Sequence, residues 1–350
     1  MSNHNMRGDT PLKAAVVGCG NVFPMHAYPV ANMEGVELVA ICDNKLDVVN
    51  WRNKEFNVKA YTDFDEMLAT EQLDILHICT PHYLHAPMAI KAFEKGLHVL
   101  TEKPMSITLD DAKAMIGAAD KAGKTLGVIF QNHYNPASQL VKRALDSGRL
   151  GGIKGVKCSV TWDRSDEYYS RSDWKGTWDK EGGGVVIDQA IHTLDLCRWL
   201  IDSPVVSVSA HTSNRNHHFI EVEDSAEGVI NFQNGVALAF FTINYHSYDA
   251  PIRIELHCEN GIATILGDQA KIEYIDGSEE SAGPDPRKSF DYGNVKSYWG
   301  VSHVTQIDNF YDCIRTGKTP DICGREALKT QEMVCAIYES GRSGARVKIR

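Results

Sequence analysis

One lysine and one acid–histidine pair are the side chains of this 350-residue chain best suited to chemistry. Lys103 stands between Glu102 and Pro104, directly after a short apolar run. Ligands of open α/β sheets bind outside the carboxyl ends of the strands, where such a lysine would lie. Asp188 and His192 are four residues apart in an apolar segment, so on a helix both face the same side. An ammonium donor with a carboxylate and an imidazole predicts proton transfer at a substrate oxygen.

A glycine turn precedes this lysine in the chain. Gly18 and Gly20 come after the apolar run 13–17 and before a helical pattern. In a dinucleotide-binding turn the first glycine permits the bend, and the second lets a pyrophosphate approach a helix end with free N–H groups. The third small residue of that pattern would fall at Phe23, which predicts looser packing of the helix on the strand. A plain strand-to-helix turn is the alternative.

Asp43 supports the dinucleotide reading. It ends the second predicted strand, where a carboxylate binds the ribose hydroxyls of the cofactor. The same carboxylate would repel a 2′-phosphate, so NAD is favoured over NADP, although Lys45 lies close by in the sequence. The alternative role for Asp43 is a turn cap.

The elements that must position these residues fall into two patterns. Up to residue 133, short apolar runs alternate with amphipathic ones, which predicts a doubly wound parallel sheet. From residue 134 onward, several strands follow one another with Asn-Gly hairpin signals, which predicts a mostly antiparallel sheet. The fold class is therefore α/β, with domains at 1–133 and 134–350. Within it we expect a helix over 87–95 and an exposed loop over 278–288.

Two further segments could contact a ligand. The stretch 168–178 contains Tyr169, Arg171 and Trp174, and aromatic faces beside polar donors suit a carbohydrate. Such residues are also enriched in oligomer interfaces, so both readings stay open. Three glycines, 182–184, precede Asp188 and would let a substrate or cofactor approach the backbone closely.

Composition excludes several classes of partner. The net charge of −10 disfavours nucleic acid and anionic membranes, and no apolar run approaches the length of a membrane helix. Nine cysteines are scattered without a Cys-x-x-Cys pair, which favours buried thiols in a reducing cytoplasm over a metal or disulfide site. The first residues lack the pattern of a signal peptide, so we expect a cytoplasmic protein. Because the cysteines form no metal-binding pair, we also expect no bound metal.

In order along the chain, these motifs resemble the glucose–fructose oxidoreductase/inositol dehydrogenase (Gfo/Idh/MocA) family, from Ala14 to about Ser340. The resemblance implies a Rossmann domain at 1–133, and at 134–350 a substrate-binding domain whose large open sheet also forms a homodimer or homotetramer. It implies NAD(P)-dependent oxidation of a sugar, inositol or related polyol. The motifs that carry it are Gly18-Cys19-Gly20-Asn21-Val22, Leu38 to Asp43, Thr80-Pro81-x-x-x-His85, Glu102-Lys103-Pro104 and Gly182-Gly183-Gly184…Asp188-x-x-x-His192.

The same resemblance assigns the site residues. Lys103, Asp188 and His192 would be catalytic and would also bind substrate, together with Tyr169, Arg171 and Trp174. The expected cofactor-binding residues are Gly18, Gly20, Asn21, Val22, Asp43, Thr80, Pro81, His85, Glu102, Lys103 and Gln131. Two positions depart from the family pattern, because His82 replaces a common asparagine and His133 a common arginine.

These residues suggest a mechanism. Hydride leaves a secondary carbinol carbon for the nicotinamide while His192 takes the hydroxyl proton, Asp188 holds the substrate and Lys103 donates to the reacting oxygen. Two alternatives remain: a glycosidase that keeps NAD bound and oxidises its substrate transiently, and a regulator that senses dinucleotide without catalysis.

Overall fold

A computed structural model describes residues 10–284 and 302–349. The first sheet is parallel, with the strand order β3-β2-β1-β4-β5-β6. Its strands are β1 (Leu12–Val17), β2 (Val36–Cys42), β3 (Lys59–Tyr61), β4 (Ile75–Ile78), β5 (His98–Thr101) and β6 (Leu126–Val128). The helices between them are α1 (Phe23–Asn32), α2 (Leu46–Phe56), α3 (Phe64–Thr70), α4 (His82–Glu94) and α5 (Leu109–Ala122). The strand order reverses between β1 and β4, which is the place where such sheets bind dinucleotides.

The second sheet has nine strands in the order β14-β13-β12-β11-β7-β10-β9-β8-β15. Neighbouring strands are antiparallel except β7 and β10, which run parallel. The strands are β7 (Ile153–Thr161), β8 (Val205–Ser213), β9 (Ser225–Phe232), β10 (Ala237–Ile243), β11 (Arg253–Cys258), β12 (Gly261–Leu266), β13 (Gln269–Tyr274), β14 (Glu279–Ala282) and β15 (Val347–Lys348). The predicted fold class is thereby confirmed.

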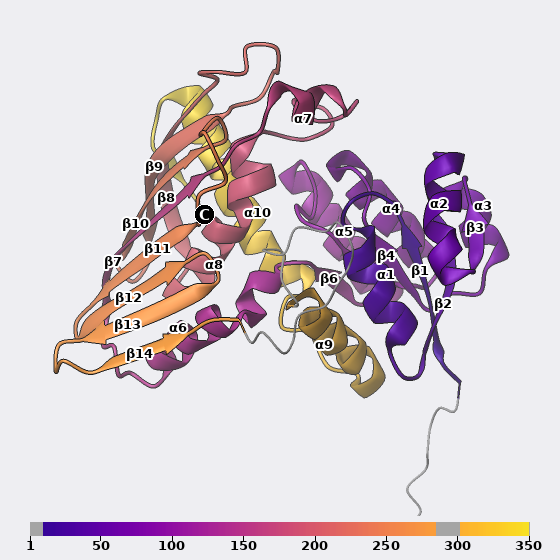
Figure 1. Cartoon of the computed structure of the whole chain (residues 1–350), viewed down its shortest axis with the longest axis horizontal. Helices are drawn as coiled ribbons and strands as arrows, with labels where there is room; N and C mark the ends of the chain where they lie inside the picture. The colour runs from indigo at the N-terminus through magenta and orange to yellow at the C-terminus, as the bar shows by residue number, and fades with distance from the viewer. Residues whose placement is uncertain (1–9, 285–301, 350) are drawn as a thin grey trace, which may run out of the picture.

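Helices join the two sheets into one molecule (Figure 1). The remaining helical elements are η1 (Gln131–Tyr134), α6 (Pro136–Asp146), α7 (Asp166–Ser170), η2 (Val185–Ala190), α8 (Ile191–Ile201), α9 (Ser302–Thr316) and α10 (Gly324–Ser343). Helix α10 packs on β8 of the second sheet and on α5 of the first domain. Helix α9 returns to the first domain, where Ile307, Phe310 and Tyr311 share a core with Val16 and Phe23. Late parts of the chain therefore stabilise both domains.

Two local expectations were wrong. Helix α4 begins at His82 rather than at residue 87, and Pro87 lies inside it. A proline inside a helix removes one backbone hydrogen bond, and burial of the face containing His85 and Ala89 offsets this loss. The segment expected as a loop contains β14, because residues 279–282 pair one after another with β13 in antiparallel register. Residues 285–288 lie outside the described part.

The described residues contain no helix that is long and apolar enough to cross a membrane.

Candidate active site at the junction of the domains

Lys103 and Asp188 meet where the two domains join. Lys103 follows β5 of the first sheet, and Asp188 lies in η2, a turn of π-helix before α8. The Lys103 ammonium donates to the main-chain carbonyl of Asp188 at 2.6 Å and to its Oδ1 at 3.2 Å. Both side chains are largely buried, with 15% and 10% of their surfaces exposed. The structure therefore brings together two of the three predicted catalytic residues.

The other carboxylate oxygen of Asp188 collects three more donors. Its Oδ2 accepts hydrogen bonds from Gln189 Nε2 at 2.6 Å, Tyr168 Oη at 2.7 Å and Lys175 Nζ at 3.0 Å. Burial by itself would raise the pKa of Asp188, but the Lys175 and Lys103 ammonium groups overcome it and hold that pKa well below its usual range. Asp188 is therefore an ionised carboxylate between two cations.

The three glycines before Asp188 make room for the protein itself. A Cβ atom on Gly182 would lie 2.6 Å from Ile107 Cβ, one on Gly183 would lie 2.0 Å from Tyr338 Oη, and one on Gly184 would lie 1.9 Å from the carbonyl oxygen of Glu223. These glycines therefore have a packing role, and the close approach of a ligand to their backbone stays a prediction.

A buried carboxyl group fixes the start of the π-helix. Glu223 accepts the N–H groups of Gly184 at 2.9 Å and Val186 at 3.0 Å, and the Tyr338 hydroxyl donates to it at 2.9 Å. The hydroxyl of Tyr338 in turn accepts the N–H of Ile187 at 3.1 Å. These contacts satisfy donors that a helix N-terminus leaves free, and they set the direction of Asp188.

His192 stands apart from Asp188. It is the second residue of α8, and no hydrogen bond or ion pair joins the two side chains among the described contacts. Its ring meets the edge of Phe130 at a centroid distance of 5.8 Å, and its Nδ1 is buried without a partner. Burial, reinforced by the Lys103 charge, lowers the pKa of His192 to about 3. His192 is therefore a neutral imidazole whose Nδ1 has no hydrogen-bond partner among the described residues.

Two further residues, His82 and Lys175, lie beside Asp188. His82 Nδ1 lies 2.8 Å from the carbonyl oxygen of Glu181, which can only accept, so Nδ1 is the protonated nitrogen. Its Nε2 then faces Asp188 Oδ1 at 3.7 Å, and its ring packs against Trp174. The histidine that departs from the family pattern therefore faces the Asp188 carboxylate.

Some residues of the aromatic segment 168–178 lie at the site, and others lie on the surface. Trp174 lies against His82, and Lys175 lies within 4.4 Å of the Trp174 ring centroid. Tyr169 is buried and accepts a hydrogen bond from Asn244 at 2.7 Å, behind the neighbouring Tyr168. Arg171 is 74% exposed and pairs with Glu167, so the structure does not bring it to Asp188.

The glycine turn has the form expected for a dinucleotide. Gly18 has φ +90°, and a Cβ there would lie 2.5 Å from the carbonyl of Cys79, whereas a Cβ on Gly20 would meet no atom within 4 Å. Asp43 accepts the N–H of Cys19 at 2.8 Å and that of Lys45 at 2.9 Å, so its carboxylate lies beside the turn. The exposed backbone at Gly20 fits a pyrophosphate.

Phe23 does not loosen the packing of α1. Its side chain is fully buried in the core of the first domain, and its ring meets the edge of Phe56 at a centroid distance of 5.6 Å. Arg52 reaches the carbonyl oxygens of Cys19 and Gly20 across the same ring. A large aromatic residue thus fills the space where the usual pattern has a small one.

The other predicted cofactor residues border the same sheet edge. Asn21 is exposed and Val22 half-buried at the start of α1, while Pro81 caps α4. His85 lies between the carbonyl oxygens of Thr80 at 2.8 Å and Pro104 at 2.7 Å, so it ties the loop after β4 to the loop after β5. This contact holds the backbone of Pro104 and thereby positions Lys103, which precedes it in the chain.

Gln131 and His133 follow the last strand of the first sheet. Gln131 is buried, and its Oε1 has no hydrogen-bond partner, which fits a donor supplied by a bound cofactor. His133 instead pairs with Asp195 at 2.5 Å and stacks on Trp199, so its role is structural.

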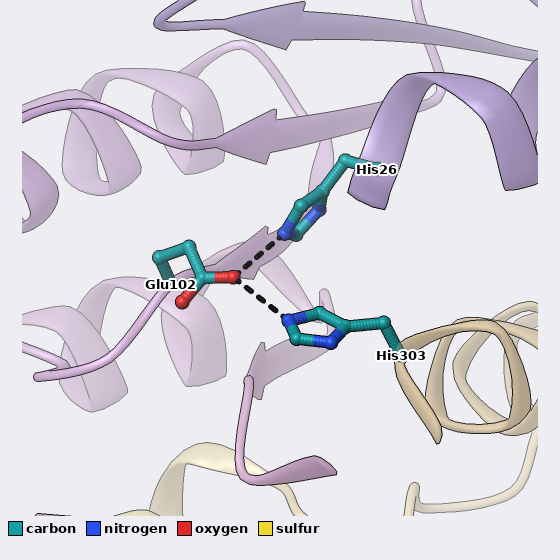
Figure 2. Close-up of side chains that lie close together, drawn as sticks. All are labelled: His26, Glu102 and His303. Atoms are coloured by element: carbon teal, nitrogen blue, oxygen red, sulfur yellow. Dashed lines mark hydrogen bonds and ion pairs between the residues drawn. The ribbon is translucent and has the colours of Figure 1, made fainter. Parts of the chain in front are cut away.

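Glu102 is enclosed by histidines (Figure 2). Its Oε1 lies 2.9 Å from His26 Nε2 and 3.4 Å from His303 Nε2. His26 contacts His77 at 2.8 Å, and His77 contacts the Tyr311 hydroxyl at 2.9 Å. Burial would raise the pKa of Glu102, but hydrogen bonds from His26 and His303 hold it well below its usual range.

The ligand atoms of His26, Glu102 and His303 lie within 4.8 Å of one another, and these are residue types that bind zinc. Neutral imidazoles that donate in one direction, from Tyr311 through His77 and His26 to Glu102, already account for the short contacts. We therefore assign no metal, and Glu102 supports the loop that carries Lys103.

The parallel sheet, its glycine turn and the buried lysine–carboxylate pair define an NAD(P)-dependent oxidoreductase with a Rossmann domain. Family profiles agree with this class. Residues 12–130 match the oxidoreductase family with an NAD-binding Rossmann fold, and residues 138–264 match the GFO/IDH/MocA C-terminal domain. The chain belongs to the Gfo/Idh/MocA family.

Individual relatives span nearly the whole chain. It is 29% identical to D-glucoside 3-dehydrogenase of Escherichia coli, over 97% of this chain and 98% of that protein. It is 28% identical to scyllo-inositol 2-dehydrogenase (NAD(+)) of Bacillus subtilis, over 97% and 96%. The WlbA dehydrogenase of Bordetella pertussis, solved with NADH and UDP-GlcNAcA, is 30% identical with a TM-score of 0.84, over 97% and 99%.

Proposed function

We propose that this enzyme oxidises a secondary hydroxyl of a sugar, inositol or related polyol and passes the hydride to NAD. The observation that carries the proposal is the pairing of the Lys103 ammonium with the ionised carboxylate of Asp188 at the carboxyl end of β5. When bound, the nicotinamide supplies the hydride acceptor. The protein must then hold the hydroxyl group and manage its proton.

Each catalytic residue has a distinct part in this proposal. Lys103 donates to the reacting oxygen and stabilises its developing negative charge. Asp188 holds Lys103 and accepts from a substrate hydroxyl group. His192 Nδ1 has no hydrogen-bond partner, and the low pKa of His192 makes it a weak base that does not retain a proton near neutral pH.

The substrate class rests on the site wall and on the relatives. Trp174 is half-buried beside Lys175 and His82, and an aromatic ring with a cation next to it suits the C–H groups and hydroxyls of a sugar ring. The relatives named above act on a glucoside and on an inositol. Tyr169 supports this wall from behind, whereas the exposed Arg171 would contribute only at its rim.

The chain belongs to a family with an NAD-binding Rossmann fold, and we propose that it prefers NAD to NADP. Asp43 lies beside the glycine turn and would repel a 2′-phosphate. We propose contacts from Gly18, Gly20, Asn21 and Val22 to the pyrophosphate side. The nicotinamide side would be bordered by Thr80, Pro81, His85, Glu102, Lys103 and Gln131.

We also propose a cytoplasmic homodimer or homotetramer, with the domain boundary between residues 133 and 134. Val229 and Phe241 are 38% and 41% exposed on neighbouring strands of the second sheet. Their side chains lie on the face opposite the buried Ile230 and Phe240. Apolar side chains on an uncovered sheet face support association between copies.

The direct test is NAD reduction by the purified enzyme with a panel of monosaccharides, glucosides, inositols and nucleotide-linked sugar acids. The proposal predicts stoichiometric NADH from at least one of them. Release of sugar from a glucoside without net NADH would instead show the NAD-dependent glycosidase. Tight NAD binding with no turnover of any panel member would contradict both enzymatic readings.

A further inference from the structure

Glu181 is a buried carboxyl group next to the site that the mechanism above does not use. Its side chain is 1% exposed. Oε2 accepts the N–H of Gly176 at 2.5 Å, while Oε1 has no hydrogen-bond partner and lies 3.7 Å from Lys175 Nζ. A buried carboxylate oxygen without a donor is costly, and protonation of Glu181 lowers that cost because it removes the negative charge.

The charges around Glu181 act in opposite directions. Burial is the largest influence and raises the pKa of Glu181 to about 8. The Lys175 ammonium lowers it, while the carboxylates of Asp188 and Glu223 raise it. The Glu181 charge also contributes to the raised pKa of Tyr338 in α10.

Two other elements complete these surroundings. The Glu181 charge contributes to the raised pKa values of Tyr168 and Tyr169 in α7. His82 of α4 reaches Glu181 through the main-chain carbonyl alone. Lys175 is therefore the one cation that contacts the Glu181 carboxyl among the described ion pairs.

A set of polar contacts leads from Glu181 to Asp188 and Lys103, and it begins with the ion pair of 3.7 Å between Glu181 Oε1 and Lys175 Nζ. Lys175 Nζ lies 2.5 Å from Tyr168 Oη and 3.0 Å from Asp188 Oδ2. Asp188 in turn contacts Lys103. The path from Lys103 to Glu181 therefore passes through Asp188 and Lys175, with the Tyr168 hydroxyl bridging them.

We propose that Glu181 takes up the proton that the substrate hydroxyl loses during oxidation. The C–H bond breaks as hydride moves to the nicotinamide, the O–H bond breaks, and the carbon–oxygen bond becomes a carbonyl. The hydroxyl proton enters at Asp188 and passes to Lys175 as Lys175 releases one of its own protons to Glu181 Oε1. Only Glu181 has then changed its charge, from carboxylate to carboxylic acid.

This inference rests on the proposed function and explains a feature that function leaves open. His192 is too weak a base to keep the released proton, and Asp188 is held ionised by two cations. Burial also raises the pKa of Glu223, to about 7, but three donors already occupy the Glu223 carboxyl oxygens. Glu181 has an unpartnered Oε1 beside Lys175, so Glu181 is the carboxyl better placed for proton uptake at neutral to slightly alkaline pH. Above its pKa Glu181 is a carboxylate that can accept a proton, and below its pKa Glu181 is already protonated.

The test is the pH dependence of hydride transfer in a single turnover, followed by reduced-nicotinamide fluorescence with the panel sugar that turns over best. For the unaltered enzyme we expect a rate that falls about tenfold per pH unit below the Glu181 pKa. Glu181→Gln should be about 10²-fold slower at high pH and should lose this acidic limb. Glu273→Gln, an exposed glutamate on β13, is the matched control and should keep both rate and profile.

A second variant and a second readout make the outcome decisive. If Glu181→Gln fails to fold, Lys175→Met interrupts the same path and should abolish the same limb. An unchanged acidic limb in either folded variant overturns the proposal. Infrared titration without substrate should show a carboxylic acid signal that disappears between pH 7 and 9 and is missing in Glu181→Gln. If no panel sugar reacts, the proposed function fails, and this infrared signal alone decides whether Glu181 holds a proton.

Discussion

The Lys103 ammonium holds Asp188 by two different atoms, its main-chain carbonyl at 2.6 Å and its carboxylate at 3.2 Å. Because Lys103 follows β5 of the first sheet and Asp188 precedes α8, this contact joins two distant parts of the chain at the site. Replacing Lys103 by alanine should reduce turnover by about 10²–10³-fold, since the developing oxyanion loses its donor. NADH affinity, measured by fluorescence titration, should change little.

The control for this variant is Lys113→Ala, an exposed lysine of α5 remote from the pair. It should match the unaltered enzyme in both measurements. Near-normal turnover of Lys103→Ala would contradict the catalytic assignment of that lysine.

The two glycines of the turn should respond differently to alanine. Gly18→Ala places a Cβ 2.5 Å from the backbone of Cys79 at φ +90°, so it should lower the free energy of unfolding by about 1–3 kcal/mol or more. Gly20→Ala meets no protein atom and should change that free energy by less than about 0.5 kcal/mol. It should nevertheless weaken NAD binding about tenfold, because the methyl group occupies the approach of the pyrophosphate.

Urea unfolding and NADH titration of both variants check this pair. Equal affinity of Gly20→Ala and the unaltered enzyme would remove the turn from the cofactor site.

Asp43→Asn should reduce the preference for NAD. The amide keeps an acceptor for the turn, where the carboxylate now accepts from Cys19 and Lys45, but removes the charge that repels a 2′-phosphate. We expect the ratio of the NADPH and NADH dissociation constants to fall by about tenfold, a change of about 1.4 kcal/mol. An unchanged ratio would show that Asp43 acts only as a cap.

His192 should make stability depend on pH. Its folded pKa of about 3 lies below the ordinary histidine value of 6.5, so the unfolded chain binds the extra proton between these values. The contribution is therefore complete above pH 6.5 and is lost as pH falls toward 3, at up to about 1.4 kcal/mol per unit. Between pH 7.5 and 5.5, the unaltered protein should lose about 1.4 kcal/mol more than His192→Asn in urea unfolding. Parallel losses would contradict the burial of a neutral His192.

Phe241→Glu should separate the copies of the proposed oligomer. The residue is exposed on the uncovered face of the second sheet, beside Glu227 on the paired strand, so a second carboxylate there would oppose association. Light scattering after size exclusion should report a smaller mass than for the unaltered protein. Ile275→Glu, exposed in the turn after β13, is the control and should leave the mass unchanged.

The sequence by itself determined the fold class and the change from a parallel to a mostly antiparallel sheet near residue 134. Alternating apolar runs before residue 133 can be buried on both faces only in a parallel sheet with helical crossovers, and that logic is local. It also located Gly18 and Asp43, because a turn conformation and a strand end are properties of neighbouring residues. Helix α5 illustrates this, with Thr108 as its N-cap and Gly123 at its C-cap, both readable from the chain.

Only the tertiary structure decided which charges surround Asp188 and what the three glycines are for. Lys175, Tyr168 and His82 reach Asp188 from separate elements, so no spacing in the sequence reveals them. The same holds for His192, whose weak basicity follows from burial beside Lys103 rather than from its distance to Asp188 in the chain. Burial and long-range electrostatics depend on the assembled domains, and for this reason residue types identified the chemistry while the fold assigned the protonation states.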